Sequence, residues 1–586
     1  EVEAGEVAAD REQQLVISAG GFERIVVEAG PGAGKTNTAT ERVLRLLETG
    51  LAPSRIVLLS FTRAAVSELR KRLGERLAST PGVSMVQIHT FDSYAAHILL
   101  LAGAKTGGNH DATVQTATRM LKARDPLVMN LVEPLEHLII DEAQDLVGPR
   151  RAFCEALIRQ LRQPCGVTVF GDFAQAIYGY QATGSESGTL LDLVQSLPGF
   201  RSMQITGNHR ARTEQLASLF QSARAFLRSA EPLTRGSYFE LRDLIEAGAV
   251  ETGIGDFAGH HSTTRGVILT RYRSSLLSVA ESMRMSGRPF RIRLNDRPLR
   301  IEPWLGACLG GLDPDTRVDR DAFVQLHEGL ENSISRTADE CWDILRDLDG
   351  MGRSHVTVGR IAEGLEYPPP ELVRDHEGRS GPLLSTVHAF KGRDADRVLM
   401  LLHPERRMEG VDWSEEARIL YVGATRASHE LRTGRAPTGN FYSIGKPERH
   451  WRPRQGYREI EIGLEGDLVE WDAFVRSVDA GSVQLLLDTI WRAGANGSLV
   501  TAVPSGRDQL MLLAPEDGTP VGLLGRQFTE VLRDITGTPD EAELPELSGV
   551  AITGATTVVV AGKAGRRPAL GLQPLLGGFA RVARQP

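Results

Sequence analysis

The residues with the clearest chemistry lie in a glycine-rich stretch near the N-terminus. Residues 25 to 36 read IVVEAGPGAGKT, an apolar strand that runs into glycines and then into Lys35 and Thr36. Glycines let the backbone curl so that its N–H groups face phosphate oxygens, and the helix predicted to follow adds partial positive charge at its N-terminus. Lys35 is expected to reach the β- and γ-phosphates, and the Thr36 hydroxyl to bind Mg²⁺. The residues expected to line the nucleotide here are Ala29, Gly30, Pro31, Gly32, Ala33, Gly34, Lys35, Thr36 and Asn37.

A second apolar strand is predicted to end in two acids. Residues 137 to 145 read HLIIDEAQD, with Asp141 and Glu142 directly after the apolar run. The carboxyl ends of parallel strands meet at one edge of a sheet, where ligands collect, so these acids are expected beside the phosphate loop. Asp141 can hold Mg²⁺ through its water shell, and Glu142 can orient and deprotonate an attacking water. The two stretches together predict hydrolysis of a Mg²⁺-bound triphosphate.

The segments around these acids resemble the motifs of the UvrD/Rep/PcrA-like superfamily 1 DNA helicases. DEAQD and then GDFAQAIYGY are similar to the second and third motifs of that family. The segments EQQLVI, LLSFTRAAVSELRKRL, VQIHTFDS, ITGNHRARTEQL, STVHAFKGRDADRV and EEARILYVGATRA match further motifs in chain order. The matches run from residue 13 to residue 427, which is 415 of 586 residues. The resemblance implies two RecA-like domains that share one ATP site.

The same resemblance assigns roles to residues around the nucleotide. In EQQLVI it puts Gln13, or alternatively Gln14, against the adenine base. Gln175 would sense the γ-phosphate, Arg210 would be a γ-phosphate cation, and Arg426 would be the arginine finger, a group that contributes about 10³–10⁵ in rate. Further nucleotide contacts are implied for His209, Gly392 and Asp394.

A second set of motif residues faces the nucleic acid in that family. Aromatic side chains in such positions stack on any base without reading its sequence. The residues that the resemblance places on single-stranded DNA are Phe61, Thr62, Arg63, Thr90, Phe91, Tyr178, Tyr180, Thr386, His388 and Lys391.

The chain departs from the family pattern at several of these positions. His209 stands where the family has a tyrosine that stacks on adenine, and Asn37 where an arginine often follows GKT. Selectivity for ATP over other triphosphates is therefore left open. Asp394 is shorter than the usual glutamate, Gln181 replaces an arginine, and Asp92 replaces a histidine. Beside a DNA phosphate Asp92 would repel, so the strand track is expected to be modified.

The length of 586 residues predicts several domains, because one hydrophobic core rarely serves so long a chain. We expect an α/β protein with two RecA-like P-loop domains, short helical insertions and a small β-rich accessory domain at the C-terminus. The first RecA-like domain is expected over residues 1 to 205, with an insertion at about 94 to 133. The second is expected over 206 to 434, with an insertion at about 301 to 379. A basic linker, 435 to 456, would lead to the accessory domain at 457 to 586, predicted as a β-barrel or a mixed α+β fold.

Composition predicts an intracellular, cytoplasmic protein. No run of about 18 apolar residues could span a bilayer, and the first ten residues, EVEAGEVAAD, do not resemble a secretory signal. The four cysteines lie far apart, with no CxxC pair for a metal, and are expected to be reduced.

The distribution of charge separates the tail from the rest. The net charge is −8, and residues 459 to 586 hold 17 acids and 10 bases, which is −7, so the preceding chain carries −1. Residues 271 to 300 have eight arginines against two acids, and residues 432 to 458 have seven bases against Glu448, so each stretch nets +6. The second stretch also holds aromatic residues, a mixture suited to phosphates and stacked bases, although a solvated surface loop is an equal alternative.

These observations predict an ATP-dependent translocase or helicase on single-stranded DNA or a tailed duplex, with ATP and Mg²⁺ as cofactors. The family resemblance implies 3′ to 5′ movement. An alternative is an ATP-switched module that remodels a protein partner such as RNA polymerase and docks through its acidic C-terminal domain. A third is an RNA translocase. The chain is expected to act as a monomer or in a hetero-complex, away from membranes.

Overall fold

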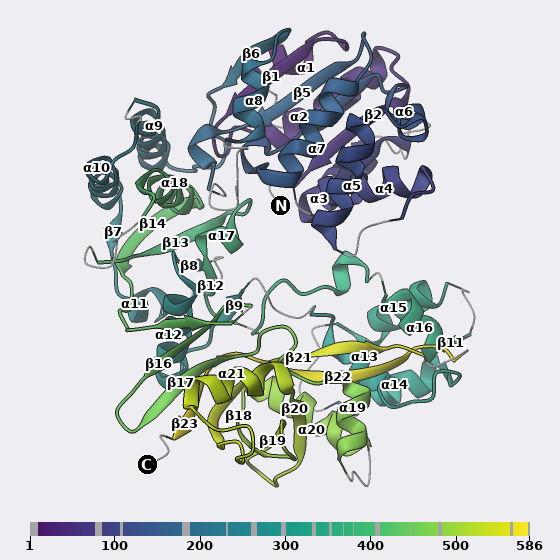
Figure 1. Ribbon diagram of the computed structural model, residues 1–586, viewed down its shortest axis with the longest axis vertical. Helices are drawn as coiled ribbons and strands as arrows, with labels where there is room; N and C mark the ends of the chain where they lie inside the picture. The colour runs from purple at the N-terminus through teal and green to yellow at the C-terminus, as the bar shows by residue number, and fades with distance from the viewer. Residues whose placement is uncertain are drawn as a thin grey trace. The chain divides into compact units, whose positions relative to one another are not determined.

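The computed structural model divides the chain into two compact units (Figure 1). Unit one contains residues 1–251, 391–400 and 405–433, and unit two contains residues 252–390, 401–404 and 434–586. The structure describes residues 10–61, 63–76, 85–105, 109–177, 188–229, 232–259, 266–294, 300–330, 336–350, 354–366, 368–378, 380–404, 411–445, 447–478, 483–562 and 566–583.

Unit one is built on a sheet of six parallel strands in the order β3-β2-β4-β5-β1-β6. The strands are β1 (Arg24–Ala29), β2 (Ile56–Ser60), β3 (Gln87–Thr90), β4 (His137–Ile140), β5 (Gly166–Gly171) and β6 (Phe200–Ile205). Strands β1, β2, β4 and β5 are fully or almost fully buried, as the apolar runs predict for a sheet covered on both faces.

Helices cover the two faces of this sheet in separate cores. Ile25 and Val27 point into one core, and Val26 between them points into the other, as strand geometry requires. The first core is closed by α1 (Arg11–Ile17), α2 (Lys35–Glu48) and α3 (Arg63–Arg76). The second is closed by α4 (Phe91–Leu101), α5 (His110–Lys122), α6 (Pro126–Val132), α7 (Gly148–Gln160) and α8 (Leu190–Ser196). Short 3-10 turns are η1 (Pro53–Arg55), η3 (Ala143–Asp145) and η4 (Phe173–Gln175).

A second group of elements completes unit one. It comprises α9 (Glu214–Ser229), α10 (Arg235–Ala247), β7 (Val250–Glu251), β13 (Ala395–Leu402), α18 (Trp413–Ala424) and β14 (Ala427–Arg435). Helices α9, α10 and α18 lie together (Figure 1), and the rings of Tyr238 on α10 and Trp413 on α18 are 5.4 Å apart. Helix α18 ends two residues before Arg426, so the packing of this helix fixes the position of the Arg426 backbone.

Unit two contains three further parallel strands, in which β12 (Leu383–Thr386) pairs with β8 (Gly266–Thr270) and β9 (Arg291–Arg293). Helices α11 (Ile254–Gly259), α12 (Arg273–Met285) and α17 (Val387–Phe390) accompany them. The chain is therefore α/β, with parallel strands in both units.

The C-terminal residues form an antiparallel sheet of nine strands. The strands are β15 (Tyr442–Ile444), β16 (Arg449–Pro453), β17 (Tyr457–Ile462), β18 (Leu499–Pro504), β19 (Leu510–Leu513), β20 (Pro520–Leu524), β21 (Leu547–Val560), β22 (Ala569–Leu576) and β23 (Gly578–Ala583). Helices α19 (Trp471–Ser477), α20 (Val483–Asn496) and α21 (Arg526–Thr536) pack with it, so the mixed α+β alternative is the one found. Strands β15 and β16 lie within the stretch expected to be a linker.

The insertion before β12 shares its core with this C-terminal sheet. It consists of α13 (Pro303–Leu309), β10 (Arg317–Asp319), α14 (Arg320–Glu328), α15 (Ala338–Asp349), β11 (His355–Thr357), α16 (Val358–Gly364) and η6 (Pro370–Leu372), with β10 and β11 antiparallel. Trp304 on α13 is 1 % exposed in the same cluster as Leu572 of β22. The Thr557 hydroxyl of β21 donates to the Glu302 carbonyl over 2.6 Å. The insertion and the tail thus fold as one body.

In the basic stretch from 432 to 458, two arginines are buried in ion pairs. Arg449 pairs with Asp467 across 2.5 Å, and the two side chains are 2 % and 1 % exposed. Arg452 pairs with Glu459 and with Glu281, the latter at 2.7 Å. These arginines are used inside the protein.

All four cysteines are buried and free. In the described part of the chain, no helix has both the length and the apolar character needed to cross a membrane.

Candidate nucleotide site

The phosphate loop joins β1 to α2 through two glycines in left-handed backbone conformations. Gly32 has φ +76° and Gly34, which caps α2, has φ +78°. A Cβ at Gly32 would lie 2.5 Å from Asn208 Oδ1, so the tight approach of these segments also excludes a side chain there. Lys35 is 8 % exposed, and its Nζ donates to the Ala29 carbonyl across 3.3 Å. The lysine is thus folded back over the loop that it closes.

The segment carrying His209 lies against the same loop. The His209 N–H donates to the Gly32 carbonyl over 2.7 Å. The Gln13 amide nitrogen donates to the Ala33 carbonyl over 2.9 Å and lies 3.3 Å from His209 Nε2. Gln13 is 3 % exposed, whereas its neighbour Gln14 is exposed to solvent. Of the two glutamines, the structure brings Gln13 to the loop.

Two carboxylates of contrasting acidity follow β4, the buried Asp141 and the partly buried Glu142. Burial and the charge of Glu142 raise the pKa of Asp141 to about 7, and Lys35 opposes this shift. Burial also raises the pKa of Glu142, but the charges of Lys35 and Lys391 and a hydrogen bond from Gln144 outweigh it and leave that pKa below its usual value. Lys35 Nζ is 3.9 Å from Glu142 Oε1. Glu142 is therefore the ionised member of the pair near neutral pH.

Glu142 also has an unusual backbone. Its φ of 54° and ψ of 44° are left-handed, a conformation that costs a non-glycine residue about 1–3 kcal/mol and that clusters at functional sites. This turn aims the Glu142 carboxylate at the Gln144 amide and the lysine of the phosphate loop. The local strain thus positions a candidate base.

Gln175 connects the acidic strand ends to residues from far along the chain. Its amide nitrogen donates to Asp172 Oδ2 over 2.7 Å, and its amide oxygen accepts from Arg426 Nη2 over 3.3 Å. Arg426 is 1 % exposed, and burial together with the charge of Arg210 lowers its pKa to about 9. Arg210 donates to the Thr425 carbonyl over 3.1 Å. The two positive charges thus lie close enough to repel each other, and the charges of Glu142 and Asp394 oppose that effect on the pKa of both arginines.

Lys391, the lysine of KGRD, forms an ion pair inside this site. Lys391 Nζ makes a short ion pair with Asp145 and donates to the Gln175 carbonyl over 2.6 Å. Burial raises the pKa of Asp145 to about 6, and Lys391 opposes the shift. Gly392, with φ +82°, and Asp394 follow in exposed backbone.

Sequence patterns missed a third arginine, Arg224 on α9. Its Nη2 lies 3.2 Å from Glu28 Oε1 and 3.4 Å from Asp172 Oδ1. A Cβ at Gly30 would be 3.3 Å from its guanidinium carbon, so the guanidinium rests against the first glycine of the loop. The hydroxyl of Tyr421 on α18 is buried without a hydrogen-bond partner, and burial raises its pKa well above the usual value. Nothing in the helical pattern of 214 to 229 distinguishes Arg224 from a surface arginine.

The donor set fits one divalent cation shared with a ligand. Burial and the charge of Glu142 raise the pKa of Asp141, a shift that a bound cation would oppose as Lys35 does, and Thr36 lies in the first turn of α2. Among the described residues, no group of three or more His, Cys, Asp and Glu side chains could hold a metal. Mg²⁺ commonly keeps its waters and takes only one or two protein ligands with substrate phosphates, so a hydroxyl and a carboxylate suffice.

The residues expected to contact DNA lie in different parts of the structure, and several of them lie outside the described residues. Phe91 is 1 % exposed in the core, and Thr90 caps α4 by accepting from the Ser93 N–H. Phe61 is partly buried. Thr62, Tyr178, Tyr180 and the side chain of Arg63 lie outside the described residues, as does Gln181. Thr386 and His388 lie in unit two, on β12 and α17.

Asp92, which would repel a phosphate if it were free, has a partner. Its carboxylate is 2.9 Å from Arg150 Nη2, and Arg150 also reaches Asp111 at 3.1 Å. The departure from the family pattern at this position is thus compensated within the protein.

Comparison with known proteins agrees with this geometry. The UvrD/REP helicase N-terminal domain matches residues 9–118 and 109–197, the segment that carries the phosphate loop, the acidic pair and Gln175. These N-terminal residues are similar to those of the UvrD/Rep-like helicases. A probable DNA helicase of Mycoplasma pneumoniae is 22 % identical over 460 residues, which cover 72 % of this chain and 83 % of that protein.

Other proteins to which the chain is similar carry similar names. The ATP-dependent DNA helicase UvrD2 of Mycobacterium tuberculosis is 28 % identical over 553 residues, covering 72 % of this chain and 77 % of that protein. Among solved structures, a Pif1 helicase from Bacteroides in complex with ADP-AlF3 and ssDNA covers 73 % of this chain and 93 % of its own, at 10 % identity and a TM-score of 0.34. That score is too low to support an argument.

Proposed function

We propose that the chain is an ATP-dependent DNA helicase that moves along single-stranded DNA. The observation that carries the proposal is the hydrogen bond from Arg426 Nη2 to Gln175 Oε1, at 3.3 Å. It joins a residue just beyond β5 to an arginine beyond α18, around the loop closed by Lys35. A nucleotide bound at that loop would meet groups from both parts of the chain, which is how a triphosphate can hold two elements together and its hydrolysis release them.

The chemistry follows from the acidities of the site. Lys35 and the loop N–H groups would bind the outer phosphates, and a bound Mg²⁺, held by Thr36 and Asp141, would supply charge neutralisation on the phosphate oxygens. Glu142, ionised near neutral pH, would accept a proton from the attacking water. Arg210 and Arg426 would stabilise the charge that develops on the transferred phosphoryl group.

The Gln175 side chain would transmit the state of the site. It is held by Asp172 on one side and by Arg426 on the other, so a change at the γ-phosphate would alter both hydrogen bonds. The segment that follows η4 begins the stretch expected to hold the strand-stacking tyrosines. Hydrolysis would in this way be coupled to the grip on DNA, with movement in the 3′ to 5′ direction.

ATP turnover measured with and without a single-stranded DNA oligonucleotide tests the proposal. We expect strong stimulation by DNA, and loss of turnover in Lys35→Ala and in Glu142→Gln while both variants keep their melting temperature. Turnover that ignored DNA, or that responded only to RNA of the same sequence or to a protein partner, would reject it. Strand displacement on 3′-tailed and 5′-tailed duplexes separately tests the direction, and only the 3′-tailed duplex is expected to be unwound.

A further inference from the structure

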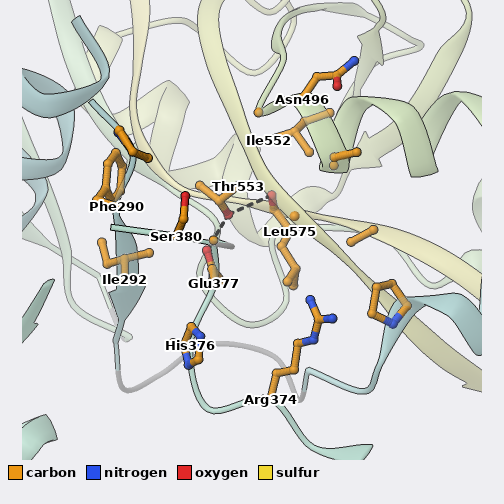
Figure 2. A pocket seen from close by; sticks show the side chains of 18 of the residues that line it. Phe290, Ile292, Arg374, His376, Glu377, Ser380, Asn496, Ile552, Thr553 and Leu575 are labelled. Atoms are coloured by element: carbon orange, nitrogen blue, oxygen red, sulfur yellow. Dashed lines mark hydrogen bonds between the residues drawn. The ribbon is translucent and has the colours of Figure 1, made fainter. Parts of the chain in front are cut away.

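A cavity of about 450 Å³ lies within unit two, and none of the described residues that line it belongs to the nucleotide site (Figure 2). Its size is within the range of about 300–1,000 Å³ usual for small-molecule sites. Phe290 and Ile292 form one wall and Ile552 and Leu575 form the other, with Glu377 between them (Figure 2). We call it the arginine pocket, because the described residues that line it include Arg284, Arg288, Arg300 and Arg374.

The one acid among the described lining residues is already neutralised. The Thr553 hydroxyl makes a short hydrogen bond to Glu377 Oε2 (Figure 2). Arg300 Nε donates to Glu377 Oε1 over 3.1 Å, so both oxygens are occupied. Arg374 pairs at 2.8 Å with Glu302, which does not line the cavity. Arg300 and Arg374 are thus held in place by carboxylates.

Arg284 is different, because within the described residues no carboxylate lies at ion-pair distance from it. Its guanidinium carbon sits 5.9 Å from the centroid of the Phe290 ring, and burial lowers its pKa. The nearby acid, Glu281, is engaged by Arg452 at 2.7 Å and by Arg581 at 3.4 Å. In the part of the chain that the structure describes, Arg288 donates a hydrogen bond to the carbonyl of Gly255. The charge of Glu281 acts on Arg284 without an ion pair, so the pocket holds two guanidinium groups that form no ion pair within the described chain.

A ligand that fits must bring an anion to these guanidinium groups and an apolar, flat part to the walls. Guanidinium groups bind phosphate oxygens in pairs, and an aromatic ring can stack beside Phe290. We propose that the arginine pocket binds a phosphate group joined to an aromatic ring, as in a mononucleotide, with Arg284 and Arg288 holding the phosphate. Free nucleotides and the terminal nucleotide of a DNA strand share this chemistry. The inference does not rest on ATP hydrolysis by unit one.

Binding of thymidine 5′-phosphate to the full chain tests the inference, with the nucleotide site of unit one saturated by Mg²⁺ and ATPγS. Calorimetric titration should detect one molecule bound, and thymidine without phosphate should not bind. In Arg284→Ala we expect the affinity to fall at least about tenfold, because a charge-assisted, forked contact is lost. Arg526→Ala is the matched control, since that arginine is exposed and, among the described residues, its ion pair is with Glu530 on its own helix. It should bind as the wild type does.

A second pair of ligands distinguishes a DNA strand end from a free nucleotide as the source of the phosphate. An Arg284-dependent preference for a 5′-phosphorylated thymidine oligomer over its 5′-hydroxyl form supports a strand end, and binding of the free nucleotide alone supports a free ligand. If Arg284→Ala does not fold, Arg288→Ala and the wild-type titration decide. The inference is overturned if the wild type binds neither ligand, if phosphate makes no difference, or if only an oligoglutamate peptide binds through Arg284.

Discussion

Arg224 on α9 donates from Nη2 to Oε1 of Glu28, the residue that precedes the phosphate loop, across 3.2 Å. The same guanidinium group lies 3.4 Å from Asp172, which in turn accepts a hydrogen bond from Gln175. A continuous line of polar contacts therefore runs from the start of the loop to the residue that would sense the γ-phosphate. Arg224 is a positioning residue in this arrangement, because it acts through Asp172 and Gln175.

Replacing Arg224 by alanine should slow ATP hydrolysis more than it weakens ATP binding. The expected loss in kcat is about 10- to 100-fold, the scale of a misplacement of about 1 Å, with a much smaller change in KM. Steady-state kinetics with saturating DNA measure the split. Arg224→Lys should recover part of kcat, because it restores the charge without the fork.

Arg228 supplies the control for this prediction. It reaches the other oxygen of Glu28 at 3.3 Å, but its side chain is 48 % exposed and it does not contact Asp172. Arg228→Ala should therefore leave kcat within about twofold, since exposed ion pairs contribute only about 0–1 kcal/mol. Equal effects of the two substitutions would mean that Glu28 neutralisation alone matters.

The pair formed by Lys391 and Asp145 predicts strong coupling between two distant motifs. Both side chains are nearly buried, at 8 % and 4 % exposed, and Lys391 also holds the Gln175 carbonyl. Removing either partner leaves a buried charge or an unmet acceptor, a change that costs about 3–5 kcal/mol of stability in buried pairs. We expect Lys391→Met and Asp145→Asn each to lower the free energy of unfolding, and the double variant to lose less than the sum.

A double-mutant cycle by urea unfolding measures this coupling. An interaction energy of about 0.5–3 kcal/mol is expected for side chains in contact. Additive losses would show that the ion pair contributes nothing of its own. The same variants assayed for DNA affinity would then tell whether Lys391 serves DNA directly, as the family resemblance implies.

Local patterns in the sequence predicted the first sheet because they carry their own physical cause. A run such as IVVEAG followed by GKT specifies a buried strand, a glycine turn and a helix start without any distant partner, and β1 and α2 form there. The acidic pair after HLII follows the same logic at β4. Long-range partners left no such signal. Arg224 looks like any helical arginine until Glu28 and Asp172 are folded around it.

For a related reason, the count of charges did not predict which arginines form ion pairs inside the protein. A net of +6 over 432 to 458 cannot tell a free arginine from one whose carboxylate lies elsewhere in the chain. Asp467 follows Arg449 by 18 residues and Glu281 precedes Arg452 by 171 residues, yet both pairs are closed. The sequence likewise did not predict that the insertion and the tail share a core, because each contributes only part of an apolar surface.

This burial yields a prediction about DNA binding. Arg452 is 6 % exposed and lies between Glu459 and Glu281, with its guanidinium carbon 4.9 Å from the centroid of the Phe579 ring. Arg452→Ala should lower the melting temperature but leave the salt dependence of DNA affinity unchanged. A phosphate-binding arginine would instead reduce the slope of log affinity against log salt by about 1. DNA titrations at several salt concentrations distinguish these results.

Acid should destabilise unit one through His137, a buried imidazole at the start of β4. Nδ1 lies 2.6 Å from the Gly21 carbonyl, which can only accept, so Nδ1 carries the proton and Nε2 accepts from the Thr168 hydroxyl at 2.9 Å. Burial, and then the charge of Arg42, lower the pKa of His137 from 6.5 to about 3. The neutral ring is favoured in the folded state, so its contribution is complete above pH 6.5 and is lost as the pH falls towards 3.

The free energy of unfolding should therefore fall by about 1.4 kcal/mol per pH unit on account of this one site as the pH drops below that of free imidazole. Urea unfolding at pH 7, 6 and 5 measures the slope, and His137→Asn should reduce it by that amount. Burial also lowers the pKa of His89, to about 4, so some slope should remain in the variant. An unaltered slope in His137→Asn would mean that other groups carry the acid sensitivity.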